Sequence, residues 1–467
     1  MIDMLPDNVL LDIFDFYRED PTLAVHIPND LLSGFSPPPW RWKTLTQVCR
    51  RWRDVIFGSP RRLDLRIVCT ETTPTRASLD IWPPFPITVI FRSLSAEDER
   101  GVENIIAAVE RIDRVSQIVI DQIDDSALEK LIATMHEPFP GLTDFCLESS
   151  EMSAVLPESF LGGSAPLLRR LILWGAPFPS FHKFILSATH IVELDLLAIP
   201  DSGYIPPETV VDSLATLPNL RSLSIAHRYP ESLPFISSLP PPIRAVLPAL
   251  TYLLVTVSQY SEAFVARIDS PLLNQLNAVF FTDLVFEIKQ LHNFISRIER
   301  LEPFNRAYMK FLSYGESGEI RMILQSPTMF ELTVMCETPD WDLSSTTQIF
   351  SRQLSLFSHV EELEIREDPE ARFEWKYDSD RDPSQWLGLF HLFIAVQSLY
   401  VSNRLVPPVS VALQELTGER TMEVLPALRN LFLEGLRPSG PAHSTIMSFA
   451  ASRKRSDHLV SIQRWDR

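Results

Sequence analysis

Apolar residues near the N-terminus recur at the spacing of an amphipathic helix. Pro6 suits the first turn of such a helix, because its missing N–H has no intrahelical partner there in any case. The apolar residues that follow at positions i, i+3, i+4 and i+7 are Leu10, Ile13, Phe14 and Tyr17. The pattern predicts a short helix with one apolar face, which Val9 widens.

A second stretch, LTQVCRRWRDVIFGSP at residues 45–60, repeats this pattern. Its apolar face would hold Leu45, Val48, Cys49, Trp52, Val55 and Ile56, and its polar face Arg50, Arg51, Arg53 and Asp54. Arg50 and Asp54 are four residues apart and can pair, and Gly58 and Pro60 end the helix. We interpret Cys49 as a small apolar residue, because no histidine lies near it in the sequence to activate a thiol. Two helices this short require a further surface to bury their apolar faces.

From about residue 115 a second kind of pattern recurs, with apolar residues at the first, fourth and sixth positions of a six-residue segment. Copies begin at Val115, Leu142, Leu168, Ile191, Leu220, Leu250, Leu273, Phe304, Met329, Val360, Val396 and Leu428. The alternation predicts a short strand with one buried face, and the stretches between copies, such as residues 288–301, have helical spacing. Copies begin 23 to 36 residues apart. Such strand–helix units bury their faces against their neighbours and form a solenoid.

The domain organisation follows from these two patterns. We predict a helical module at 1–60 with an insertion at about 18–40, then a connecting region and first repeat-like unit at 61–114. The latter holds a strand at 87–91 and a helix at 96–112. The solenoid would cover 115–452, and 453–467 would form an exposed basic tail or a nuclear signal. Because the copies vary in length, an ordinary α/β domain is the alternative.

Composition narrows the function classes. A net charge of −18 and a pI of about 5.0 oppose binding to phosphate backbones, so we expect no nucleic-acid partner. The four cysteines form no CxxC pair, which suits a reducing compartment. The longest apolar stretch, at 387–401, is shorter than the ~20 residues of a membrane span, and no signal peptide is visible. We therefore expect a cytoplasmic or nuclear protein without a membrane partner.

The motifs of catalysis and metal binding are missing from the sequence. The segment YGESGE at 314–319 is not a G-x-S-x-G turn, and the acidic run after Asp378 has Pro383 where a calcium loop requires glycine. The ten histidines include no HExxH pair, and no phosphate-binding glycine motif occurs. We expect no enzyme activity, no cofactor and no metal.

The N-terminal residues resemble the F-box, a helical module of ubiquitin ligases. The resemblance rests on Leu5-Pro6, Ile13-Phe14 and the VCRxW sequence at 48–52, although Asn8 replaces an acidic residue and the insertion is long. It implies binding to a Skp-type adaptor through Leu5, Pro6, Val9, Leu10, Ile13, Phe14, Leu45, Val48, Cys49, Trp52 and Val55. A helical hairpin that caps a larger domain is the alternative.

The whole layout resembles large F-box families of filamentous fungi. It implies an α/β chain in which a short all-helical F-box precedes an irregular leucine-rich-repeat-like solenoid. Such a chain is expected to recruit a protein substrate to an SCF-type cullin ubiquitin ligase and to catalyse nothing itself. The expected substrate-binding residues on the solenoid strands are Trp174, Glu193, Asp195, Tyr252, Glu362, Glu364, Tyr400 and Phe432. Carboxylates with scattered aromatic residues suit a basic or apolar protein. A stand-alone repeat scaffold, or a solvated face without a specific ligand, is the alternative.

Overall fold

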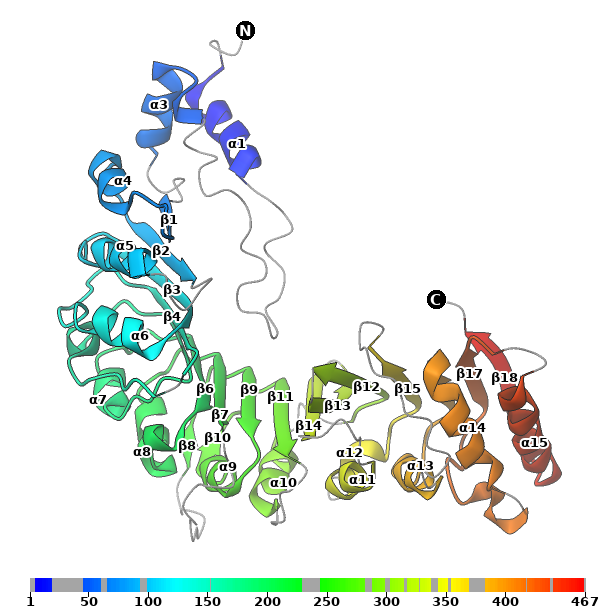
Figure 1. The fold of residues 1–467 in the computed structure, drawn as a ribbon. Coiled ribbons are helices and arrows are strands. Elements are labelled where there is room, and N and C mark those ends of the chain that lie inside the picture. The colour runs from blue at the N-terminus through cyan, green and yellow to red at the C-terminus, as the bar shows by residue number, and fades with distance from the viewer. Residues whose placement is uncertain are drawn as a thin grey trace. The chain divides into compact units, whose positions relative to one another are not determined.

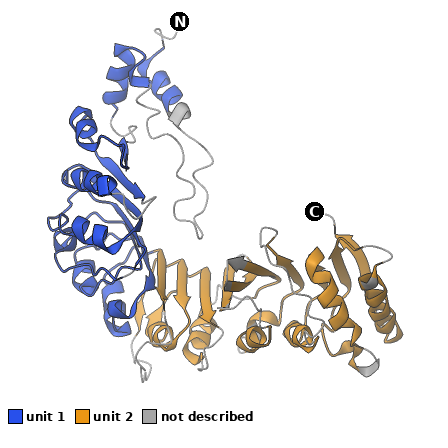
Figure 2. Ribbon diagram, viewed as in Figure 1, with its two compact units in different colours: residues 1–220 blue, residues 221–467 orange. Residues whose placement is uncertain are grey.

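The structure is a computed structural model that describes most of the chain. The described residues are 5–18, 45–59, 65–92, 99–151, 153–228, 244–281, 288–298, 303–314, 317–326, 328–336, 343–351, 354–368, 383–416, 418–436 and 440–465. The insertion expected at 18–40 and the acidic run after Asp378 therefore lie outside the described residues, apart from Arg18. The chain divides into two compact units, residues 1–220 and 221–467 (Figure 2).

Unit 1 begins with two helices that contact each other, α1 (Asp7–Arg18) and α3 (Arg50–Phe57). The single helix predicted from Leu45 to Ile56 is wrong, because the backbone of Cys49 is extended, with φ −159° and ψ 170°. The Cys49 sulfur accepts a hydrogen bond from the Trp52 N–H at 3.4 Å. Cys49 therefore caps α3, satisfying one of the N–H groups that a helix leaves unpaired at its start.

A small core joins α1 to α3. Its buried members are Leu10, Phe14 and Ile56. The rings of Phe14 and Trp52 lie 4.8 Å apart between centroids, and Trp52 packs against the core with Leu5, Leu11, Leu45, Val55 and Phe57. The apolar side chains at helical spacing therefore pack the two helices against each other, and three of these side chains are buried in the contact.

The rest of unit 1 consists of parallel strands followed by helices (Figure 1). The strands, in chain and sheet order, are β1 (Leu65–Cys69), β2 (Ile87–Arg92), β3 (Val115–Ile123), β4 (Asp144–Ser149), β5 (Arg170–Trp174) and β6 (Glu193–Ile199). The helices are α4 (Thr75–Ile81), α5 (Glu99–Val109), α6 (Asp125–Ile132), α7 (Phe181–Ile185) and α8 (Pro207–Leu214). The array of strands begins at Leu65, one strand earlier than the sequence indicated.

Unit 2 continues the same construction. Its sheet order is β7 (Ser222–His227), β9 (Tyr252–Thr256), β11 (Gln275–Phe281), β14 (Met329–Cys336), β13 (Ser317–Gln325), β12 (Arg306–Tyr314), β15 (Glu362–Glu367), β16 (Ser398–Val401), β17 (Asn430–Glu434) and β18 (Ser461–Trp465). A separate small sheet pairs β8 (Ala245–Val246) with β10 (Ile268–Asp269). The helices are α9 (Gln259–Val265), α10 (Lys289–Ser296), α11 (Leu343–Ser351), α12 (Leu354–Phe357), α13 (Ser384–Phe390), α14 (Val406–Gln414) and α15 (Pro441–Arg455). The fold is therefore α/β with mainly parallel strands.

Each sequence copy forms a strand, but two of the strands do not follow chain order in the sheet. The copies at Phe304 and Met329 form β12 and β14, and β13 lies between them although no copy predicted it. β13 pairs antiparallel with both neighbours, while β14 is parallel to β11 and β12 is parallel to β15. The prediction of strand–helix units in a uniformly parallel array is wrong here, because a hairpin reverses the chain. In this hairpin Tyr314 pairs with Ser317.

The C-terminal segment is part of the fold. α15 extends to Arg455, and residues 461–465 form β18, which pairs in parallel with β17. Arg453 is fully buried and donates hydrogen bonds to the carbonyls of Val424 and Leu425, at 2.5 and 3.2 Å. Burial lowers the pKa of Arg453 to about 10. The prediction of a separate tail from residue 453 is therefore wrong, because Arg453 is buried and residues 461–465 form a strand, although Lys454 and Arg455 are exposed as expected.

The strands of each unit have one buried face and one open face. In β4, Phe145 and Leu147 are buried, whereas Asp144, Cys146 and Glu148 between them are half-buried. Helices α9 to α13 lie on one side of the unit 2 strands in Figure 1. We call the strand face opposite the buried one the open face. None of the helices in the described ranges combines the length and hydrophobicity that a membrane crossing requires.

Candidate interaction surfaces

The apolar residues of α1 divide between two directions. Leu10 and Phe14 are 0% and 6% exposed, because they face α3. Ile13 is 46% exposed, and Val48, just before α3, is 56% exposed. Of the remaining residues expected to bind an adaptor, Pro6 is exposed and the others are partly buried: Leu5, Val9, Leu45, Cys49, Trp52 and Val55. The predicted residues thus form a core and an outer apolar surface, and only the latter is available to a partner.

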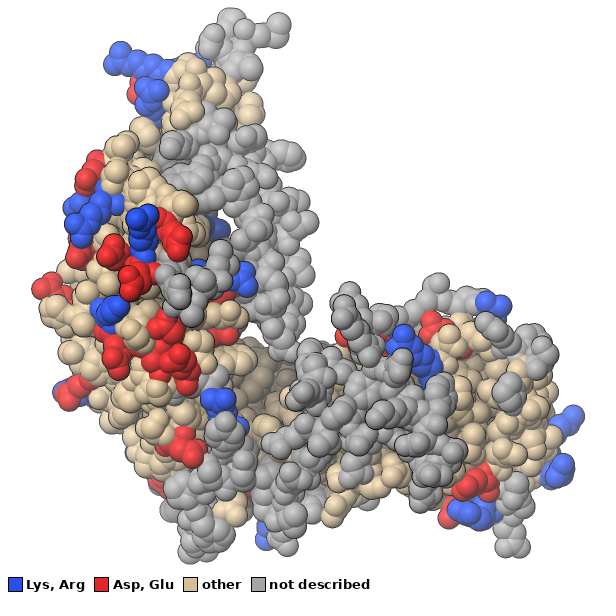
Figure 3. All heavy atoms as spheres, in the orientation of Figure 1, with Lys and Arg blue, Asp and Glu red and all other residues tan. Residues whose placement is uncertain are grey.

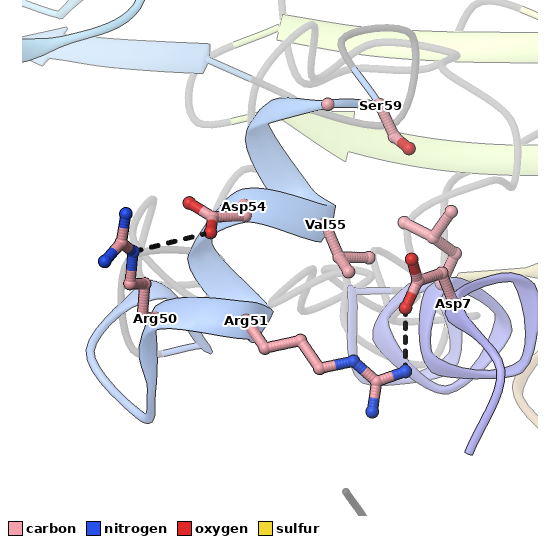
Figure 4. Close-up of a pocket in the computed structure, with 8 residues that line it drawn as sticks. Asp7, Arg50, Arg51, Asp54, Val55 and Ser59 are labelled. Carbon is pink, nitrogen blue, oxygen red and sulfur yellow. Dashed lines mark hydrogen bonds and ion pairs between the residues drawn. The ribbon is translucent and has the colours of Figure 1, made fainter. Parts of the chain in front are cut away.

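Arg51 links the beginning of α1 to α3. Its Nη2 donates a hydrogen bond to Asp7 Oδ1 at 2.8 Å (Figure 4) and another to the carbonyl of Leu5. Arg53 Nε also turns back, to the carbonyl of Thr46 at 3.1 Å. Arg53 is nevertheless exposed, as predicted, whereas the prediction that Arg51 points to solvent is wrong, because the Leu5 carbonyl and the Asp7 carboxylate lie within its reach. Arg50 also behaves as predicted, with its Nε 3.8 Å from Asp54 Oδ2.

A hollow of about 590 Å³ lies beside this link. It is lined by Asp7, Leu11, Arg50, Arg51, Asp54, Val55, Gly58 and Ser59. Figure 4 shows Arg51 reaching across to Asp7, while Arg50 and Asp54 pair on the outer side of α3. The hollow therefore combines two apolar side chains with charged groups that are already paired. The sequence did not reveal it, because its residues come from two segments about 40 positions apart.

Polar side chains on the open face of unit 1 form a row across six strands. The aligned residues are Arg66, Thr88, Gln117, Asp144, Arg170 and Glu193. Thr88 Oγ1 donates to Gln117 Oε1 and Gln117 Nε2 donates to Asp144 Oδ2, both at 3.1 Å. Arg170 Nε lies 3.1 Å from Glu193 Oε1. Glu193, which we expected to meet a basic partner, is therefore already paired within the chain.

Trp174 and Asp195 also lie on this open face. Trp174 is half-buried, opposite Glu148 on β4 and Leu197 on β6, and Asp195 stands opposite Ile172. Cys146 lies in the same row as Asp195, and burial raises the pKa of the Cys146 thiol to about 12. A thiol with this pKa stays protonated at neutral pH and is a poor nucleophile.

Carboxylates on the open face of unit 2 are paired in the same way. Arg306 Nε lies 2.8 Å from Glu362 Oε2, and Arg366 forms an ion pair with Glu364. Tyr252 stands opposite Ser222 and Gln275, away from these pairs in the sheet order. Glu193, Glu362 and Glu364 therefore each have an arginine partner on the same or the adjacent strand, which the sequence pattern did not assign to them. On the side of unit 1 seen in Figure 3, charges of both signs are likewise interspersed.

Aromatic side chains gather at the end of the unit 2 sheet. The rings of Tyr400 and Phe432, on β16 and β17, are stacked with centroids 4.3 Å apart and planes 5° apart. Trp465 on β18 meets Tyr400 edge to face at 5.5 Å. Arg366 Cζ lies 4.9 Å from the centre of the Trp465 ring. We call Tyr400, Phe432 and Trp465 the aromatic cluster. The sequence identified Tyr400 and Phe432 but missed Trp465, whose SIQRW segment was assigned to a tail.

The closest approach to a catalytic pair among the contacts described is that of His182 and Ser213. His182 Nδ1 lies 2.8 Å from Ser213 Oγ. The Ser213 hydroxyl donates its one proton to the carbonyl of Thr209 at 2.7 Å, so the histidine acts as donor and not as base. Ser213 is also 0% exposed, which keeps substrates away from it. Within the described ranges, no group of three or more His, Cys, Asp or Glu side chains is arranged to hold a metal ion.

Comparisons with known proteins leave the chain without an assigned family. No family model matches it, and no curated protein sequence matches it. Among solved structures it is similar to the leucine-rich repeat-containing protein LegL7 from Legionella pneumophila, with 11% identity and a TM-score of 0.31. The match covers 83% of this chain and 98% of that one. The strand–helix units are therefore established by the strands and helices of this chain alone.

Proposed function

We propose that this chain is a substrate-recruiting F-box subunit of a cullin ubiquitin ligase. The helix pair α1–α3 binds a Skp-type adaptor, the adaptor binds a cullin, and the open face of the strand array binds a protein substrate. The chain catalyses nothing itself and acts by holding the substrate close to the transfer reaction, which raises its local concentration.

The observation that carries this proposal is the exposed apolar surface of the helix pair. Ile13 is 46% and Val48 is 56% exposed, although both belong to segments with an apolar pattern. Exposed apolar side chains beside a small separate core are typical of a surface that a partner covers. Arg51 ties the beginning of α1 to α3 and so helps to keep the two helices together.

The test is co-purification of the full chain with a Skp-type adaptor. Ile13→Asp and Val48→Asp place a charge in the proposed interface without touching the buried core, and we expect each to weaken binding by at least about tenfold. Val411→Asp is the matched control, because Val411 is 48% exposed on α14, and it should leave binding unchanged. Adaptor binding that survives both N-terminal substitutions would refute the proposal. Leu10→Ala is less informative, since Leu10 is buried and its loss opens the pair itself.

A stand-alone protein-interaction scaffold is the second candidate function. The observation in its favour is that Leu10, Phe14 and Trp52 are largely satisfied by contacts within the pair. On this reading α1 and α3 form a terminal cap, as repeat arrays require. A monodisperse chain that ignores the adaptor, and in which Ile13→Asp changes no interaction, would favour this candidate.

A further inference from the structure

The aromatic cluster at the end of unit 2 already holds a guanidinium group. Arg366 extends from β15 over the ring of Trp465 on β18, and its Cζ lies 4.9 Å from the ring centre. β16 and β17, which carry Tyr400 and Phe432, separate these two strands in the sheet. The arrangement shows which chemical group fits the cluster, since an aromatic face attracts a planar cation.

The local charge also favours a cation. The open-face charged residues of β15 to β18 are Glu362, Glu364, Arg366 and Glu434. Because Glu362 is paired with Arg306 on β12, the remaining charges are two carboxylates and one guanidinium. Glu364 pairs with Arg366. Glu434 stands directly opposite Trp465 in the β17–β18 register and accepts a hydrogen bond from the Asn403 N–H at 3.2 Å. A guanidinium seated on Trp465 therefore has Glu364 as its ion-pair partner, and Glu434 occupies the strand position next to Trp465.

Arg366 is held in this position against a competing repulsion. Lys310 on β12 stands directly opposite Arg366 in the β12–β15 register. Like charges placed opposite each other on neighbouring strands destabilise the pair. The aromatic cluster and Glu364 thus retain an arginine that its nearest cross-strand neighbour repels, and an incoming guanidinium in the same position would be held by the same two contacts.

We infer that the aromatic cluster recognises an arginine side chain of the partner protein, and that Arg366 occupies this site in the free chain. The incoming guanidinium replaces Arg366 on Trp465 and takes over its ion pair with Glu364. Lysine fits less well, because its ammonium group is more strongly hydrated and does not stack on a ring. This inference rests on the proposed function to the extent that the open face is the surface that binds a partner protein.

The experiment measures fluorescence anisotropy of the purified full chain with two fluorescein-labelled probes at 0.15 M salt. The probes are the peptides Gly-Arg-Gly-Arg-Gly-Arg and Gly-Lys-Gly-Lys-Gly-Lys, which carry the same charge and so equalise the general attraction of an acidic chain. We expect the arginine peptide to bind about fivefold more tightly. Trp465→Leu removes this preference, because leucine keeps an apolar side chain without an aromatic face. Phe85→Leu is the matched control, because it also exchanges a half-buried aromatic ring for leucine but lies in the loop before β2, and it preserves the preference.

Arg366→Gln provides the decisive variant because it leaves the aromatic cluster intact. We expect it to strengthen binding of the arginine peptide by about fivefold or more, whereas Arg366→Lys gives a smaller gain. Unchanged or weaker binding in Arg366→Gln, or an arginine preference that survives Trp465→Leu, overturns the inference. Adaptor binding is measured on the same preparations. A chain that binds the adaptor without arginine preference retains the proposed function and loses this inference, and the reverse result retains only the inference.

Discussion

The N-terminal helix pair and the strand array are stabilised on different scales. The pair has three buried side chains and one arginine that links its helices. In the strand array of each unit, each buried strand face is followed by another, so that apolar contacts continue from one strand to the next. A core of a few residues contributes little to the free energy of folding. Neighbouring repeats, in contrast, stabilise one another because each buries its apolar face against the next. The difference indicates that the pair by itself is less stable than the array, so that a partner of the kind proposed above would add to its stability.

The largest effect is expected from a cavity in the array. Phe264 on α9 is 0% exposed, and Phe264→Ala should lower the free energy of unfolding by about 3–5 kcal/mol. Urea denaturation followed by circular dichroism measures the change. Val411→Ala, at an exposed array position, is the control and should change it by less than about 0.5 kcal/mol. Equal effects of the two substitutions would mean that the array lacks the shared core described here.

A cavity in the helix pair should act locally. Leu10 is 0% exposed, and Leu10→Ala removes one of three buried side chains at a cost of about 2–5 kcal/mol. This cost exceeds what so small a core can supply, so we expect α1 and α3 to open while the array stays folded. Hydrogen exchange should show faster amide exchange at residues 7–18 and 50–57 and unchanged exchange in β3 to β5. Loss of protection in those strands would contradict the independence of the pair.

A buried carboxylate connects two successive array helices and makes the array sensitive to pH. Glu262 on α9 accepts hydrogen bonds from the N–H groups of Gln290 and Leu291, at 2.6 and 2.8 Å, at the start of α10. Burial raises the pKa of Glu262 to about 7. Between the ordinary pKa of 4.5 and about 7, the folded chain keeps a proton that the unfolded chain has released. The contribution of Glu262 to stability is therefore present below pH 4.5 and is lost as the pH rises through 7.

The substitution Glu262→Gln tests this coupling, because glutamine keeps a carbonyl acceptor and does not ionise. The stability of the natural chain relative to this variant should fall by about 1–3 kcal/mol between pH 4.5 and pH 8. Urea denaturation at both pH values measures the change. A difference that stays constant with pH would show that Glu262 does not ionise in this range.

The strands were predictable because apolar residues at alternating positions mark a buried face in many of them. Leu194 and Leu196 on β6, for example, are buried, whereas Glu193 and Asp195 beside them are half-buried. The reversed order of β12 and β14 was not predictable, because the alternation specifies which face of a strand is buried and not which strand lies beside it. β13 did leave a signal, since Ile320, Met322 and Leu324 alternate and are all buried.

The candidate sites were less predictable than the strands. Apolar spacing placed Leu10 and Ile13 on one face, but only the packing of α1 on α3 separates the buried residue from the exposed one. The carboxylates at Glu362 and Glu364 were visible in the sequence, whereas their partners, Arg306 and Arg366, depend on strand register. Long charged side chains find their partners across strands, which a one-dimensional pattern does not contain.

The reversed strands of unit 2 impose an order on folding. A chain that emerges from the ribosome can add each parallel strand to the one before it, as β9 adds to β7 and β11 to β9. β12 has no such neighbour, because the positions between it and β11 belong to β13 and β14, which are synthesised later. Assembly must therefore pause at β11 until Cys336 at the end of β14 has been made, and the remaining strands then extend from an edge that the hairpin completes.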